Sequence, residues 1–156
     1  TVSEPRLSPL SSLGAFLGAL LGGRVAFPRA RLGQPLTIEG EDWLIFREMV
    51  VRPRPGQPAL PAAVFRPRFR LAGMGFRVNR LFSLLAIPFF SGLPGFRSKL
   101  WLYRPASGEY SGWYEWDSAA DAQAYAASFA ARFMTRRAVP GSVAFSVLPN
   151  PRAQTS

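Results

Sequence analysis

The side chains of this chain that could do chemistry are acids, arginines and hydroxyls, because the sequence contains no cysteine and no histidine. That absence excludes disulfides, thiolate or imidazole metal sites, and nucleophilic triads that use histidine as the base. Three acids stand close together at Glu39, Glu41 and Asp42. Acids in a short glycine-bounded loop are usually solvated, so no metal is expected there. Phosphate loops and zinc spacings are also missing, which argues against nucleotide and metal enzymes.

Positive charge dominates the chain. Nineteen Lys and Arg residues stand against nine acids, giving a net charge of +10, and every basic residue except Lys99 is an arginine. Residues 62–104 hold seven Arg, Lys99 and no acid, whereas four acids follow between residues 109 and 121. Guanidinium groups bind phosphates and membrane headgroups well, although a GC-rich genome also favours Arg over Lys. Both an anionic partner and a purely compositional origin stay open.

Residues 1–61 form an arm that precedes the main domain. Residues 9–23 are uncharged and rich in small residues and leucine, but they fall short of the roughly 20 apolar residues that span a bilayer. We expect a short covered helix here, or else a segment, residues 8–23, that docks on a membrane surface or a protein complex. No signal peptide is expected, which predicts a cytoplasmic protein with membrane association as the alternative. A strand is predicted from Trp43 to Val51.

Residues 62–149 carry the pattern of a single α+β domain, with residues 150–156 as a tail. Apolar residues alternate with arginines over residues 65–71, which predicts a strand at a sheet edge or bulge, because Pro67 cannot donate to a ladder. A helix follows, interrupted at Pro88, and its apolar spacing comes from Leu81, Leu84 and Leu85.

The second half of the domain contains the clearest signals. Aromatic segments flank a Pro-Ala-Ser-Gly turn and predict a hairpin over residues 96–117. Ser118 and Asp121 form a capping box for a helix that ends before Pro140, and a last strand covers residues 143–147. The order β-α-β-β-α-β is that of the ferredoxin-like plait.

Residue parity sorts the side chains of this sheet onto two faces. The face expected to pack on the helices collects Phe65, Phe69, Leu71, Phe96, Leu100, Leu102, Tyr110, Tyr114, Trp116, Val143, Phe145 and Val147. The other face is cationic and aromatic, and its interface candidates are Arg66, Arg68, Arg70, Lys99, Trp101 and Trp113. A second copy of the sheet, the N-terminal arm or nucleic acid could cover it. The third strand lacks the RNP1 string, so nucleic acid is not expected.

Four short motifs carry a family resemblance. They are Gly92-Leu93-Pro94-Gly95, Ser98-Lys99-Leu100-Trp101, the run from Gly112 to Ser118, and Ala122-Gln123-Ala124-Tyr125. Residues 92–125 resemble the dimeric α+β barrel superfamily, in particular its antibiotic-biosynthesis-monooxygenase-like branch. The resemblance extends weakly over residues 63–148 and does not cover the arm.

The resemblance implies a homodimer whose sheets meet face to face, and a pocket between each sheet and its own helices. Some members oxidise aromatic compounds without metal or flavin, so no cofactor is expected. Candidates to line the pocket are Asn79, Arg80, Tyr114, Trp116 and Tyr125. Many relatives carry a histidine on the second helix, and its absence here excludes haem degradation that needs a histidine ligand.

Two functional hypotheses follow. The first is a mono-oxygenase-like protein that binds an apolar or aromatic small molecule. The second is a non-catalytic accessory subunit that docks on a membrane protein or larger complex through its arm and its Arg-rich face.

Overall fold

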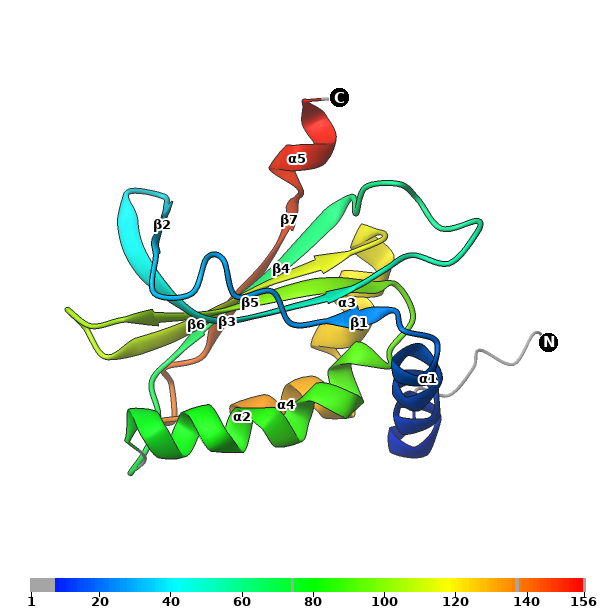
Figure 1. Cartoon of the computed structure of the whole chain (residues 1–156). Helices are drawn as coiled ribbons and strands as arrows, with labels where there is room; N and C mark the ends of the chain where they lie inside the picture. The colour runs from blue at the N-terminus through cyan, green and yellow to red at the C-terminus, as the bar shows by residue number, and fades with distance from the viewer. Residues whose placement is uncertain (1–7, 74, 137, 156) are drawn as a thin grey trace.

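The computed structural model describes residues 8–73, 75–136 and 138–155, which form one seven-stranded antiparallel sheet with all helices but the short C-terminal one on one side (Figure 1). The strands are β1 (Val25–Ala26), β2 (Pro35–Ile38), β3 (Glu41–Val51), β4 (Ala63–Phe69), β5 (Phe96–Arg104), β6 (Glu109–Trp116) and β7 (Ala144–Pro149). The helices are α1 (Pro9–Leu21), α2 (Phe76–Ser91), α3 (Ala119–Ala126), α4 (Phe129–Thr135) and α5 (Pro151–Gln154). Helices α1, α2 and α4 lie below the sheet, whereas α5 and β2 rise above it.

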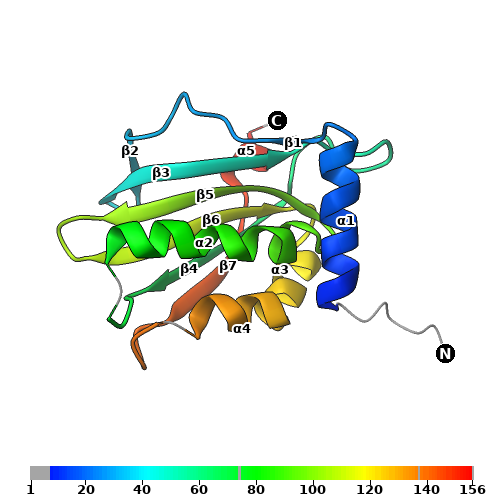
Figure 2. The same ribbon diagram turned by 60° about the horizontal axis from the view of Figure 1, so that its bottom comes forward.

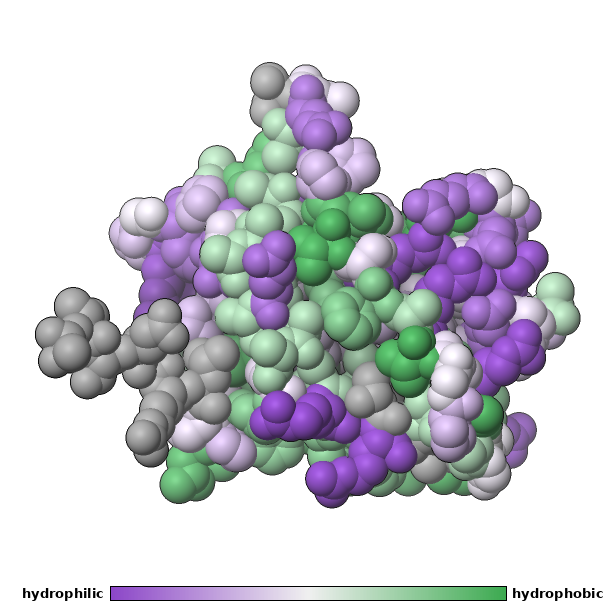
Figure 3. Space-filling model, turned by 180° about the vertical axis from the view of Figure 1, so that it is seen from behind, coloured by the Kyte–Doolittle hydropathy of each residue, from purple (hydrophilic) through white to green (hydrophobic). Residues whose placement is uncertain are grey.

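The order β5-β6-β4-β7 within the sheet, with α2 and the α3–α4 pair as crossovers, confirms the predicted ferredoxin-like plait. The strands of the arm extend the same sheet, because β3 pairs along β5 and in turn carries β1 and β2. The predicted strand from Trp43 to Val51 is therefore present, two residues longer at its start. Strand β7 is the opposite edge, and a band of apolar surface runs over it (Figure 3).

The predicted effects of two prolines, Pro67 and Pro88, differ from what the structure shows. Pro67 lies in β4, which is an interior strand, and the pairing of β4 with β6 has no partner residue for Arg66 or Pro67. Helix α2 continues through Pro88 to Ser91. The predicted second helix is divided at Ser128, whose side chain caps α4 by accepting from the Ala131 amide.

A β-bulge changes the faces that parity predicts for β5. The pairing of β5 with β6 shifts between Phe96 and Ser98, so that one extra residue reverses the alternation from Ser98 onward. Lys99 and Trp101 consequently face the helices, opposite Tyr114 and Gly112, and not the open face as parity predicts. Leu100 and Leu102 make the reverse change and join a second apolar cluster on the open face.

Helices α1 and α2 expose several of their large aliphatic side chains. In α2 the polar Asn79 and Ser83 are buried, whereas Leu81 and Leu85 are exposed. The apolar spacing therefore predicts the helix correctly, but the leucines lie on its solvent side. No helix in the described part of the chain is long and apolar enough to cross a membrane.

Candidate functional site

A hollow lies on the sheet face opposite the helices. It has a volume of about 700 Å³, within the usual range for sites that hold small molecules. Three segments rise around it: the β2–β3 hairpin, the loop of residues 52–62, and α5 (Figure 1). The open face is therefore covered along its rim by the chain itself and is hollow at its centre.

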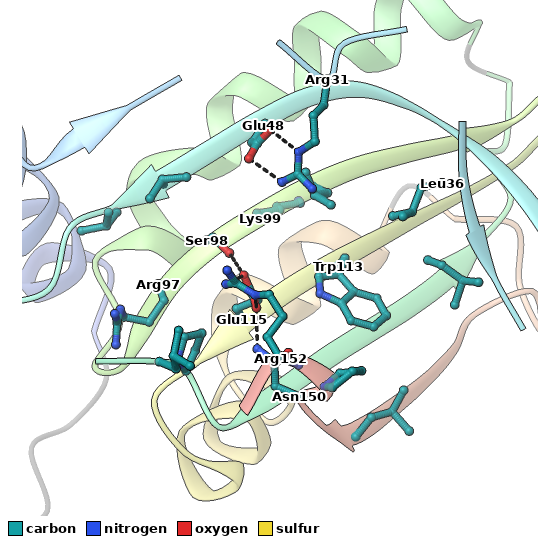
Figure 4. A pocket seen from close by; sticks show the side chains of 18 of the residues that line it. Arg31, Leu36, Glu48, Arg97, Ser98, Lys99, Trp113, Glu115, Asn150 and Arg152 are labelled. Carbon is teal, nitrogen blue, oxygen red and sulfur yellow. Dashed lines mark hydrogen bonds and ion pairs between the residues drawn. The ribbon is translucent and has the colours of Figure 1, made fainter. Parts of the chain in front are cut away.

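The lining of the hollow is apolar at its floor and charged around it (Figure 4). Val50, Leu100 and Trp113 come from β3, β5 and β6, and Leu36 and Leu148 come from β2 and β7. Trp113 is partly exposed, which leaves an aromatic surface available to a ligand.

Glu115 anchors the C-terminal wall of the hollow. Its carboxylate accepts hydrogen bonds from Ser98 Oγ at 2.7 Å, from Arg152 Nε at 3.0 Å and from the side-chain amide of Asn150 (Figure 4). Burial alone raises the pKa of Glu115, but the bonds from Arg152, Ser98 and Asn150 together outweigh burial and leave its pKa below the usual value. Glu115 is therefore an anion at neutral pH and a weak base.

Because this carboxylate holds Asn150, the cap of α5, acidification is expected to release the C-terminal wall. A lowered pKa stabilises the folded state above the ordinary value of 4.5, and this contribution is lost as pH falls through the folded pKa. We expect Glu115→Gln to make hydrogen exchange of the Asn150 side-chain amide about tenfold faster at neutral pH. The NMR signal of this amide measures the effect, and equal protection in both proteins would contradict it.

Two further ion pairs hold the other walls. Arg31 binds Glu48 through Nη2 at 2.6 Å, above the floor formed by β3. Arg97 binds Asp117 at 2.9 Å and donates to the carbonyl of Pro58 at 2.6 Å, which fixes the loop of residues 52–62 to the sheet. The acids that line the hollow are thus paired with arginines, and basic side chains, Arg52 among them, surround its apolar floor.

The cationic face predicted from β4 is neutralised by the arm. Arg66 binds Glu39 at 3.1 Å, and Arg68 binds Glu41 at 3.0 Å. Both guanidinium groups also stack on the ring of buried Trp43, at 5.8 and 5.2 Å from its centroid. Two of the acids expected in solvent thus hold the β2–β3 hairpin over β4, and the arm is the observed cover of this part of the face. Arg70 lies at the exposed end of the strand, where it donates to the Ser107 carbonyl.

The five pocket candidates are divided between core and surface. Asn79 and Tyr114 line one small cavity of about 20 Å³ between α2 and the sheet, which has room for one water molecule. Trp116 and Tyr125 stack behind it with ring centroids 5.1 Å apart and are fully buried. Arg80 is exposed on α2. The small cavity beside Asn79 and Tyr114 is therefore too small for an organic ligand. A hollow of about 270 Å³ on the same side of the sheet lies among residues of β4, α4 and the segment before β7, and none of the five candidates lines it.

Lys99 joins the candidates around this cavity. Its Nζ lies 2.5 Å from Tyr114 Oη and 4.3 Å from the centroid of Trp101. Phe90 forms another wall of this aromatic cage, at 4.6 Å from the amine. The Asn79 Oδ1 atom is buried in the same region with no hydrogen-bond partner among the described residues. A single water in the cavity would satisfy it.

Neither a family model nor a curated protein sequence matches the chain. An uncharacterised ferredoxin-fold protein related to antibiotic biosynthesis monooxygenases, from Listeria monocytogenes 4b F2365, aligns over 87% of this chain and 88% of its own, with 15% identity and a TM-score of 0.56. A heme-degrading enzyme from Listeria monocytogenes aligns over 87% and 93%, with 13% identity and a TM-score of 0.55. A monooxygenase-like protein from Listeria innocua aligns over 72% and 66%, with 15% identity and a TM-score of 0.53. The chain therefore has the ferredoxin-like fold of the proteins related to antibiotic biosynthesis monooxygenases, as its motifs predict.

Most residues that line the hollow carry no signal in the sequence that would identify them as part of a site. Val50 and Leu36 lie in the arm, outside the segment that resembles a family. The run Asn150-Pro151-Arg152 does carry a local signal, because Asn at the cap and Pro at the first helical position mark a helix start. That signal predicts α5 but not its contact with Glu115, which is 35 residues away from Asn150 in the chain.

Proposed function

We propose that this protein is a mono-oxygenase-like small-molecule binder that holds an apolar, aromatic ligand in the hollow on the open face of its sheet. The observation that carries the proposal is the hollow itself, which combines a volume of about 700 Å³ with a floor of Val50, Leu100 and Trp113. Apolar walls with few polar groups are typical of sites for such molecules.

The pairing of the carboxylates in the lining supports the ligand class. Glu48 and Glu115 both accept from arginines, so neither carboxylate is left to attract a cation or to repel an aromatic ring. Trp113 offers a ring face on which a flat molecule stacks, and such aromatic pairs add about 0.5–1.5 kcal/mol beyond the burial of apolar area. An aromatic ring system of moderate size fits this arrangement best.

Trp113 also reports on the site. The other three tryptophans, Trp43, Trp101 and Trp116, are at most 3% exposed, so a soluble quencher such as acrylamide reaches mainly Trp113. We expect the dye 1-anilinonaphthalene-8-sulfonate to gain fluorescence on the folded protein and to protect Trp113 from acrylamide. Trp113→Phe removes the protectable signal, and because phenylalanine keeps a ring face at this position, dye binding is expected to weaken only slightly.

A pair of arginine substitutions localises the dye. Val50→Arg places a long cation at the floor of the hollow and is expected to weaken dye binding about tenfold, since it displaces apolar contact area. Ala144→Arg, at an exposed position of β7 outside the hollow, is the control and leaves binding unchanged. Equal effects of the two variants would contradict the proposal.

The predicted homodimer competes for the same surface. A second copy seated sheet to sheet would have to fit between the β2–β3 hairpin, α5 and the loop of residues 52–62 (Figure 1). Without dye, Trp113 could already be protected from acrylamide. If dilution removes this protection and light scattering shows that the mass falls by half at the same time, a second copy occupies the hollow. That result would overturn ligand binding at this site.

Oxygenation of the bound molecule without metal or flavin stays a prediction. It requires a base that meets the ligand, and Glu115, with its lowered pKa, is poorly suited to remove a proton. The accessory subunit docked on a membrane protein or larger complex also stays a prediction. The hollow supports binding more directly than either.

A further inference from the structure

Helix α2 buries Ile87 and Phe90 in the core but also holds several large aliphatic side chains outward. Leu81 is 69% exposed and Leu85 is 58% exposed, whereas Asn79 is only 2% exposed. Val78 lies on the same outer face, one helical turn before Leu81, and is 58% exposed. A helix on a sheet normally turns its apolar stripe inward. Large aliphatic side chains that face outward therefore indicate a surface that a binding partner buries.

Helix α1 also exposes large aliphatic side chains. Its buried residues are the small Ser12 and Ala19, whereas Leu10 and Leu21 are 82% and 88% exposed. Leu17 falls between them at helical spacing and is also exposed. The two helices pack together where α1 crosses the C-terminal end of α2, at Ser12 and Gly92 (Figure 2). We call the exposed leucines and valine of α1 and α2 the aliphatic surface.

The charges on the helices that carry the aliphatic surface have one sign. The sequences of α1, α2 and α4 contain no Asp or Glu, whereas α2 carries Arg77 and Arg80, both exposed. Neither forms an ion pair within the described part of the chain. Arg47, on the neighbouring β3, lies close enough to Arg80 that burial first and this positive neighbour second lower its pKa to about 10. The partner of this surface must therefore be apolar and anionic.

A second copy of the chain does not meet this requirement. A symmetric contact centred on Leu81 would bring Arg77 and Arg80 of one copy toward the same arginines of the other, with no acid on α1 or α2 to compensate. Tyrosine and tryptophan, which dominate the energetic centres of protein interfaces, are also missing from the exposed positions of α1 and α2. A lipid surface needs only exposed aliphatic area and nearby cations.

We propose that the aliphatic surface of α1 and α2 docks on an anionic membrane, with the leucines among the acyl chains and Arg77 and Arg80 on the headgroup phosphates. The sequence predicts a docking segment at residues 8–23 alone, and the structure adds α2 to it. The protein lies on the membrane surface in this arrangement, with the hollow facing the aqueous side because it opens on the other face of the sheet.

Co-sedimentation with lipid vesicles tests the proposal. The full chain is expected to bind vesicles of phosphatidylcholine with about one third phosphatidylglycerol, and to release them at about 0.5 M salt. Leu81→Glu with Leu85→Glu is expected to weaken binding at least about tenfold, because both side chains leave the apolar layer. Both positions are exposed, so the variant keeps its fold, which the Trp113 signal of the hollow verifies.

The matched control introduces the same two charges elsewhere. Ala120→Glu with Ala124→Glu places glutamates at exposed positions of α3 with the same spacing, and is expected to change binding less than about twofold. Equal losses in the two variants, equal binding to pure phosphatidylcholine, or absence of vesicle binding by the unaltered chain would each overturn the proposal. A dimer that Leu81→Glu and Leu85→Glu dissociate would overturn it as well, in favour of a second copy.

Discussion

Trp43→Ala is expected to lower the free energy of unfolding by about 3–5 kcal/mol, the cost typical of a fully buried tryptophan. Trp43 is completely buried in the cluster of the open face, between the β2–β3 hairpin and the strand β4. Its ring also covers Arg66 and Arg68, whose partners Glu39 and Glu41 belong to the same hairpin. Removing it therefore takes away both the apolar contact and the surface on which the guanidinium groups stack.

Chemical denaturation measures this loss, with Leu44→Ala as the control. Leu44 is the next residue of β3 and is 36% exposed, so its truncation is expected to cost less than about 1 kcal/mol. Trp43→Phe keeps most of the ring and should fall between the two. If Trp43→Ala cost no more than Leu44→Ala, the hairpin would not be held over β4 in solution.

Gly92→Ala is expected to expel α1 from the helix layer. A Cβ atom at Gly92 would lie 1.8 Å from the Ser12 carbonyl oxygen and 2.5 Å from its carbon, and both belong to the backbone of α1. No side-chain rotation relieves such an overlap, so the helix itself must move. Overpacking of this kind costs about 1–3 kcal/mol, which corresponds to a roughly 5- to 150-fold larger population with α1 detached.

Limited proteolysis in α1 measures that population, and two glycines of the same helix supply controls. A Cβ atom at Gly14 or Gly18 would meet nothing within 4 Å. Alanine at either position is expected to stabilise α1 by up to about 1 kcal/mol, through helix propensity alone. Relative to the unaltered protein, we expect faster cleavage in Gly92→Ala and slower cleavage in Gly14→Ala. Equal rates in both variants would show that α1 does not pack against Gly92.

Local patterns predict most of the elements. The aromatic hairpin of β5 and β6 and the capping of α3 by Ser118 depend on neighbours in the chain, and both are present. The faces of β5 are a different matter. One bulged residue between Phe96 and Ser98 exchanges the two sides of the strand, and such a bulge is set by pairing with a distant strand.

The candidate site depends even more on distant contacts. Glu39 and Glu41 are predicted to be solvated because no basic residue close to them in the sequence could pair with them. In the folded chain, the β2–β3 hairpin places them beside arginines that are 27 residues away. The buried face of α2 is also predicted incorrectly at Leu81. Periodicity locates an apolar stripe, and we expect such a stripe to face the core, but Leu81 faces outward. Local reasoning therefore gives no indication of the hollow on the open face.

Lys99 is the only lysine of the chain, and it is 6% exposed inside a cage of aromatic rings. The folded protein consequently offers no accessible lysine amine to acylating reagents or to enzymes that conjugate through lysine. The rate of chemical acetylation of Lys99 therefore measures unfolding, because it follows the population of molecules in which the helix layer has separated from the sheet. Surface recognition, by contrast, falls almost entirely to guanidinium groups, which keep their charge at every physiological pH.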